Sequence, residues 1–146
     1  MSDFFDSSVL IGLIFEDCPE HIDCVKAWTG SADKVMYSHG ILETFSQLTG
    51  GRLAAPVPPD VATESIARNL QQNRVDVIEF EATEVLELLE KTRRMGVRGG
   101  AVYDYMHLCA ARKVGAERIF TLNKRHFTAI APDLIPKIFH PSDHTY

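Results

Sequence analysis

The sequence has no long hydrophobic run, and this shortage restricts where the protein works. The longest apolar stretch, Val9 to Phe15, is far shorter than a membrane-spanning helix. A secretory signal needs a basic region and an apolar run, and Asp3 and Asp6 interrupt the first residues where these would stand. We therefore expect a soluble, cytoplasmic protein with no membrane partner.

Cysteine is also scarce. The three cysteines are odd in number and form no C-x-x-C pair, so neither a disulfide framework nor a paired zinc motif is expected. Reduced thiols fit a cytosolic protein. Cys18, His21 and Cys24 lie close in sequence and leave a shared metal as a minor alternative, although zinc ligands usually show tighter paired spacing.

An excess of positive charge is missing as well. The formal net charge is −5, which argues against a protein that coats nucleic acid by bulk charge. Nucleic-acid chemistry at a metal site is still allowed, because a bound cation reverses the local sign. No phosphate-binding Walker loop or dinucleotide fingerprint occurs. A chain of 146 residues that is 45% apolar predicts one domain over residues 1–146.

Short apolar segments alternate with helical patterns along the chain. We expect strands at residues 3–6, 34–38, 75–80, 118–121 and 135–140. Helices are expected from residue 9 with Ser7 and Ser8 as caps, at 21–28, around 41–48, at 61–70 with Asp60 as cap, at 83–94 and at 101–113. Such alternation predicts an α/β fold with a central, mostly parallel, twisted sheet covered by helices on both faces.

Three acids and one amide fall at the carboxyl ends of these expected strands, where parallel sheets place their sites. Asp6 ends the first strand, and Glu43 begins the helix after the second. Asp104 begins the helix after the glycine-rich break at 96–100, and Asn123 follows the strand at 118–121. Taken singly, each has an ordinary explanation as a helix cap, a dipole-favoured acid or a turn residue.

Taken together, these acids require a counter-ion. Two carboxylates about 4 Å apart repel by roughly 1 kcal/mol in water and about 4 kcal/mol at an effective dielectric constant of 20. Converging carboxylates suit Mg²⁺ or Mn²⁺, which prefer oxygen ligands and can activate water for attack on a phosphate.

Several segments resemble the PIN domain family, and most of all the toxin ribonucleases of VapBC-type toxin–antitoxin pairs. The segments that carry the resemblance are Phe5 to Ile11, Ile41 to Phe45, Val102 to Ala111, Gly115 to Asn123, and His126-Phe127. No single motif is specific, but their order and spacing extend over nearly the whole chain.

The resemblance implies a PIN-like fold and a metal-dependent endoribonuclease that cuts single-stranded RNA with metal-activated water. It implies that Asp6, Glu43 and Asp104 bind Mg²⁺ or Mn²⁺ and that Asn123 belongs to the catalytic set. Asn123 stands where the family often has a fourth acid, so the number of metals stays open. Ser7 and Thr121 match hydroxyl positions that orient acids or water.

Further expectations concern partners. Arg98, Lys124 and Arg125 are candidate contacts for RNA phosphates, with loop solvation as the alternative. The resemblance also implies a cognate antitoxin and a homodimer. The apolar residues considered for these interfaces, which otherwise fill the core, are Ile11, Phe15, Trp28 and Phe45.

Other functions fit less well or stay open. A haloacid dehalogenase-type phosphatase needs a second Asp where this chain has Ser8, and a receiver domain needs a phosphoacceptor Asp where it has Phe80-Glu81. His107 and His126 are candidate general acids, although His107 is better explained as a packed residue. The open alternative is a catalytically weak or inactive PIN-like module that binds RNA or protein.

Overall fold

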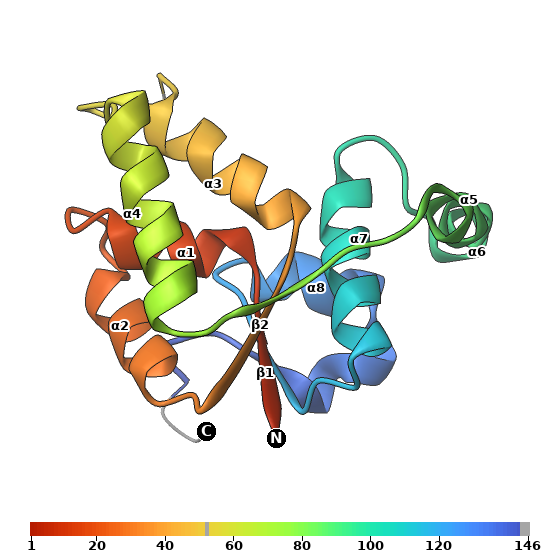
Figure 1. The fold of residues 1–146 in the computed structure, drawn as a ribbon. Helices are drawn as coiled ribbons and strands as arrows, with labels where there is room; N and C mark the ends of the chain where they lie inside the picture. The colour runs from red at the N-terminus through yellow and green to blue at the C-terminus, as the bar shows by residue number, and fades with distance from the viewer. Residues whose placement is uncertain (52, 144–146) are drawn as a thin grey trace.

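A sheet of parallel strands forms the centre of the molecule. The computed structural model describes residues 1–51 and 53–143. Within them the sheet has five strands in the order β3-β2-β1-β4-β5, and every neighbouring pair is parallel (Figure 1). The strands are β1 (Ser2–Phe5), β2 (Asp33–Tyr37), β3 (Asp76–Ile78), β4 (Arg118–Phe120) and β5 (Ile138–Phe139). The predicted parallel α/β sheet is confirmed.

Successive residues of β1 point to opposite faces of the sheet, as strand geometry requires. Phe4 belongs to one buried cluster, together with Leu108 of α7 (Ala101–Lys113) and Phe127 of α8 (Lys124–Ile130). Phe5 belongs to another cluster, with Leu10 of α1 (Ser7–Ile14) and residues of α2 (His21–Thr29). Both faces are therefore covered, and β1, at the centre of the sheet, is buried on each side.

The other helices extend these two layers. α3 (His39–Thr49) and α4 (Pro59–Gln72) pack on each other and on α1. α5 (Ala82–Glu90) and α6 (Thr92–Met95) lie beyond α7, away from the sheet (Figure 1). The Tyr105 hydroxyl donates to the carbonyl of Leu88 over 2.6 Å and thereby ties α5 to α7.

Helix caps differ from the sequence prediction. α1 is capped by Asp6, whose carboxylate accepts from the Val9 backbone N–H, and the two serines lie inside the helix. Pro58 precedes α4, so Asp60 lies in its first turn. α5 begins with a reciprocal capping box of Glu81 and Glu84, one residue before the expected start at Thr83.

Near the end of the chain the prediction was incomplete. α8 was not expected, because its seven residues carry only a weak apolar pattern. The strand expected at 135–140 is reduced to β5, since a 3-10 helix, η1 (Pro132–Lys137), occupies the preceding residues and contains two prolines.

Trp28 lies in the core and not at an interface. It is 2% exposed and its ring packs against Phe5, so the suggestion that it serves in a dimer contact was wrong. Ile11, Phe15 and Phe45 are partly buried around the contact of α1, α3 and α4. Across residues 1–51 and 53–143, no helix has the length and apolar character to cross a membrane.

A buried ion pair links β1 to β4 at the end opposite the carboxyl ends of the strands. Both carboxylate oxygens of Asp3 accept from the Arg118 guanidinium, over 2.7 and 2.6 Å, and the Asp3 side chain is 2% exposed. Arg112 and Asp133 form a pair of the same two-bond geometry whose carboxylate is 62% exposed. The two pairs differ mainly in burial.

We predict that Asp3→Asn lowers the free energy of unfolding by about 3 kcal/mol, because it removes the charge from the buried carboxylate of this two-bond ion pair. Asp133→Asn is the matched control and should cost less than about 1 kcal/mol, since its pair is exposed to solvent. Urea denaturation at neutral pH measures both, and equal losses would contradict the argument.

Candidate active site

The four residues singled out in the sequence come from elements that meet at the carboxyl ends of the strands. Asp6 directly follows β1, and Asn123 follows β4, the strand next to β1. Glu43 lies in the second turn of α3, and Asp104 lies in the first turn of α7. The parallel topology thus gathers side chains that are up to 117 positions apart in the sequence, from Asp6 to Asn123.

Asp6 is buried, and both of its carboxylate oxygens are hydrogen-bonded. Its side chain is 2% exposed. One oxygen accepts from the Ser8 hydroxyl and from the Val9 backbone N–H, and the other accepts from the Thr121 hydroxyl over 2.7 Å. The carboxylate is therefore held by α1 and by the segment after β4 at the same time.

Each of the two hydroxyls also accepts a backbone hydrogen bond. The Leu122 N–H donates to the Ser8 hydroxyl, and the Asn123 N–H donates to the Thr121 hydroxyl, each over 2.9 Å. An accepting hydroxyl has its own proton free to donate, so both protons are directed at Asp6. The carboxylate is oriented before any ligand arrives.

Burial raises the pKa of Asp6, while the neighbouring His107 and the hydrogen bonds from Ser8, Thr121 and Val9 oppose the rise. Burial also raises the pKa of Asp104, and the charge of Asp6 adds to that rise, with a smaller addition from Glu43. Asp104 is therefore repelled by Asp6 and more weakly by Glu43, while His107 and His126 act to lower its pKa. This is the electrostatic cost expected of converging carboxylates without a cation.

Glu43 is held by a histidine. The Nε2 atom of His107 lies 2.5 Å from a Glu43 carboxylate oxygen, and the His107 side chain is 1% exposed. Its ring packs edge-on against Phe4 and Tyr37. A Cβ added to Gly40 would lie 3.1 Å from the ring, so the glycine allows α3 to approach His107 closely. His107 is thus packed, as expected, and it also positions Glu43.

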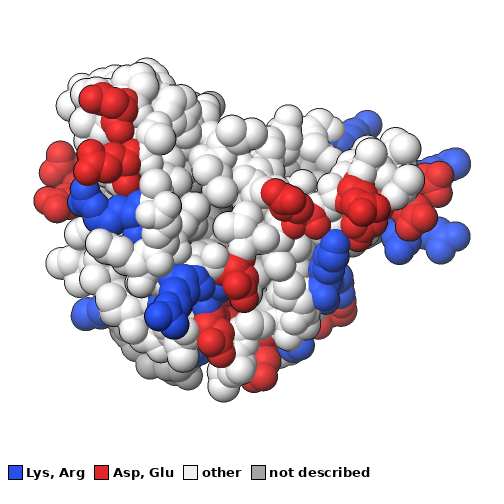
Figure 2. All heavy atoms as spheres, viewed as in Figure 1, with Lys and Arg blue, Asp and Glu red and all other residues white. Residues whose placement is uncertain are grey.

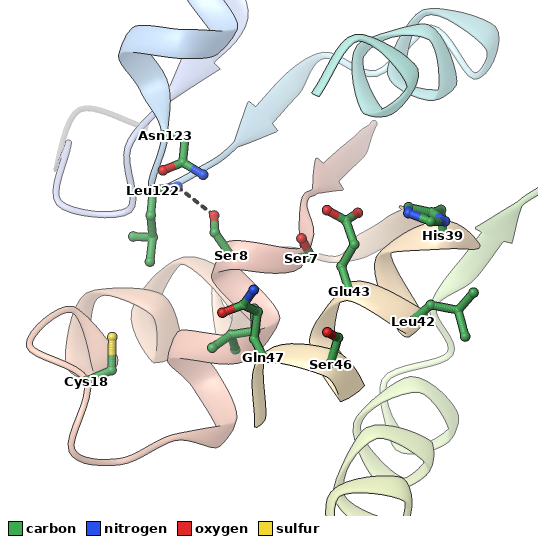
Figure 3. A pocket seen from close by; sticks show the side chains of 11 residues that line it. Ser7, Ser8, Cys18, His39, Leu42, Glu43, Ser46, Gln47, Leu122 and Asn123 are labelled. Carbon is green, nitrogen blue, oxygen red and sulfur yellow. Dashed lines mark hydrogen bonds between the residues drawn. The ribbon is translucent and has the colours of Figure 1, made fainter. Parts of the chain in front are cut away.

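A cavity of about 570 Å³ is lined by Glu43, but not by Asp6 or Asp104 (Figure 3). Figure 3 shows Ser7 and Ser8 from α1, Glu43 and His39 from α3, and Asn123 after β4 around it. The residues that line it are Ser7, Ser8, Ile11, Cys18, His39, Leu42, Glu43, Ser46, Gln47, Leu122 and Asn123. Most of its polar groups are hydroxyls and amides.

Asp104 lines a different pocket, together with His126. The Nδ1 atom of His126 lies 3.9 Å from an Asp104 carboxylate oxygen, and His126 is exposed. Of the candidate RNA contacts, Arg98 and Arg125 are exposed, whereas Lys124 pairs with Asp143 over 2.6 Å. The face in Figure 2 mixes cations with acids and carries no continuous basic stripe.

Metal-ligand geometry is not preformed. In the part of the chain that the structure describes, no three His, Cys, Asp or Glu side chains are gathered as a metal site. At the alternative site of Cys18, His21 and Cys24, two side chains have other partners: His21 contacts the carbonyl of Gly12 over 2.8 Å, and the Cys18 thiol donates to Glu20 over 3.1 Å. Even so, the donor chemistry at Asp6, Glu43 and Asp104 fits a hard divalent cation, because all three supply carboxylate oxygens.

Sequence reasoning missed Ser8 and the role of His107. Ser8, and not Ser7, donates to Asp6, while Thr121 does so as expected. The available signal was an aspartate directly before a helix with a serine two residues later, an arrangement in which the side chains can bond locally. The contact between His107 and Glu43 joins residues 64 positions apart and has no local signal.

Comparison with known proteins gives one family. The model of the PIN domain matches residues 4–131, which is most of the chain. None of the curated proteins matches the sequence.

Two solved structures share the fold at low sequence identity. VapC20 of Mycobacterium tuberculosis, a toxin that cleaves the sarcin–ricin loop, has a TM-score of 0.70 at 18% identity, covering 87% of this chain and 94% of its own. VapBC2 of Rickettsia felis, bound to a DNA fragment from its promoter, has a TM-score of 0.65 at 16% identity, covering 96% and 98%. Both similarities extend over most of each chain.

The raised pKa of Asp104 predicts how its neutralisation changes stability in the metal-free protein. Near pH 3 the group is protonated in both states, so Asp104→Asn should have little electrostatic effect. As the pH rises above 3.8, the unfolded chain ionises first, and the wild type loses stability until the pH passes the raised folded pKa. At pH 7, Asp104→Asn should therefore be more stable by on the order of 1 kcal/mol.

The control for this measurement is Asp133→Asn. Arg112 lowers the pKa of Asp133, so this substitution should lose stability at pH 7 and converge with the wild type in acid. Urea denaturation in EDTA from pH 3 to pH 7 tests both signs. A pH-independent difference for Asp104→Asn would mean that burial and the charge of Asp6 do not raise the pKa of Asp104 in the folded protein.

Proposed function

Because the chain belongs to the PIN domain family, we propose that it is a metal-dependent ribonuclease, the toxin of a toxin–antitoxin pair, that hydrolyses single-stranded RNA. The observation that supports this is the position of Asp6, Glu43 and Asp104 on elements that meet at the carboxyl ends of the parallel strands, with Glu43 lining an open cavity. Acids in this arrangement suit a hard cation and a phosphate.

Asp6, Glu43 and Asp104 would hold Mg²⁺ or Mn²⁺. When bound, the cation supplies activated water and offsets negative charge on the phosphate. The chain's own residues do the positioning: Ser8 and Thr121 fix Asp6, and His107 fixes Glu43. These supporting hydrogen bonds keep the acids oriented, as the partners of metal ligands generally do.

Substrate contacts are assigned to groups around the rim. Asn123 lines the cavity and is exposed, so its amide can donate to a phosphate oxygen without adding charge. Arg98 and Arg125 are exposed cations that suit the RNA backbone on either side, and Lys124 can join them by leaving Asp143.

For the antitoxin we propose an apolar groove between α3 and α4 as the docking surface. It encloses about 270 Å³ and is lined by Ile41, Leu42, Phe45, Thr63, Ile66, Ala67 and Leu70. Leu42 is 65% exposed there. An amphipathic antitoxin segment would cover these side chains with its own apolar face. A homodimer is the second proposed association.

Purified protein should cleave single-stranded RNA in Mn²⁺ or Mg²⁺, and EDTA should stop the reaction. Asp104→Asn should slow cleavage by several powers of ten, because it removes a charged ligand worth several kcal/mol in the transition state. Asp133→Asn removes an exposed carboxylate far from the site and should cut normally. Metal-dependent cleavage that survives in Asp104→Asn would place the chemistry elsewhere, and binding of RNA without any cleavage would favour the inactive binding module.

Mn²⁺ should raise the melting temperature of the wild type, because a ligand that binds only the folded state stabilises it. The rise should shrink in Asp104→Asn. It should grow in Asn123→Asp, which adds a fourth acid and should lower stability in EDTA. Thermal melts with and without Mn²⁺ measure these changes, with Asp133→Asn again as the control. If Mn²⁺ leaves the melting temperature of the wild type unchanged, the carboxylate metal site is refuted.

A further inference from the structure

Two stacked aromatic rings lie directly beside the acids. The rings of His39 and Tyr103 are stacked, with their centres 4.8 Å apart and their planes nearly parallel, at an angle of 5°. His39 begins α3 and Tyr103 lies in the first turn of α7. The pair therefore joins the two helices that supply Glu43 and Asp104.

The ring pair of His39 and Tyr103 lies close to Glu43 and Asp104 in the sequence. His39 precedes Glu43 by four residues, which puts both side chains on one face of α3, one turn apart. Both line the cavity beside Ser7, Ser8 and Asn123 (Figure 3). Tyr103 directly precedes Asp104.

Tyr103 contributes little to the core. Its side chain is 48% exposed, and it belongs to none of the buried clusters formed by the described residues. The ring of His39 also contacts the ring of Tyr37, with 6.2 Å between their centres. Tyr37 in turn packs against His107 and Phe80. The exposed ring of Tyr103, stacked on His39, is therefore available to stack with a planar group of a ligand.

His39 lines the cavity and Tyr103 does not, so the residues beside His39 indicate which part of a nucleic acid the ring pair would contact. Among the described residues that line the cavity there is no Lys or Arg to pair with a phosphate. The polar groups of Ser46 and Gln47 are uncharged and can hydrogen-bond to a base edge. Aromatic rings stack with bases of any sequence, because every base has a π-face.

We propose that His39 and Tyr103 form a stacking platform for an unpaired nucleobase of single-stranded RNA, next to the phosphate at Asp6, Glu43 and Asp104. This inference rests on the proposed ribonuclease function and assigns its substrate-binding surface. A base inside a duplex is stacked on its neighbours and cannot use the platform, so the surface favours single strands.

The test is fluorescence titration of the full-length protein with short oligouridylates, each carrying 2-aminopurine at a different position, in EDTA so that nothing is cut. Wild-type protein should quench the probe at one position by stacking. Tyr103→Leu should abolish the quenching and weaken binding roughly 10-fold, the range of one lost base–aromatic stack. Tyr103→Phe keeps the ring and should behave as wild type.

An oligouridylate that is abasic at the quenched position supplies the matched ligand control. It should bind wild-type protein and Tyr103→Leu equally, because the stacking base is missing in both cases. If the rings merely join α3 to α7, Tyr103→Leu will lower the melting temperature and leave quenching and affinity unchanged, which overturns the platform. Absence of any binding by the wild type overturns it as well.

Cleavage in Mn²⁺, measured on the same proteins, separates this inference from the proposed function. Position-specific quenching that Tyr103→Leu abolishes, in a protein that cuts no RNA, would refute the nuclease and support the platform. If the wild type cleaves RNA and Tyr103→Leu changes neither the quenching nor KM, the nuclease is supported and the platform is refuted.

Discussion

The buried carboxylate of Asp6 is the group on which the rest of the site depends. A charged group with 2% exposure is costly unless its hydrogen-bonding capacity is used. Here Ser8, Val9 and Thr121 all donate to it, so one side chain caps α1 and joins β1 to the segment after β4. The same bonds that make its burial tolerable also fix the direction in which the acid faces.

Asp104, which lies near Asp6, is repelled by the negative charges of Asp6 and Glu43. Asp104 and Glu43 are brought towards Asp6 by helices that are firmly packed on the sheet, so the acids cannot move far apart. His107, which contacts Glu43, packs against the rings of Phe4 and Tyr37. Rigid packing of the surroundings therefore holds together charges that would separate in a flexible chain, which is the condition for binding a cation and a phosphate tightly.

The net charge of −5, together with the mixture of acids and cations on the face in Figure 2, argues against attraction of RNA through bulk charge. Affinity has to come from local contacts at the site. In the proposed function, a bound cation, the exposed arginines and the aromatic pair would supply contacts of different kinds, and base stacking would depend neither on the base sequence nor on charge.

The sequence by itself determined the alternation of strands and helices, the parallel sheet, and the placement of Asp6, Glu43, Asp104 and Asn123 at the carboxyl ends of strands. These features follow from local periodicity and from the rule that parallel strands end at one edge. They can be recognised in the sequence without knowing which side chains contact one another.

Only the tertiary structure decided which residues meet. It selected Ser8 over Ser7 as the partner of Asp6, joined His107 to Glu43, stacked His39 on Tyr103 and buried Trp28. Hydrogen bonds and ring contacts depend on ångström-scale distances between elements, and periodicity fixes the face of a helix but not its position along a neighbour. The partners of each acid are therefore decided by the packing of the elements and not by sequence spacing.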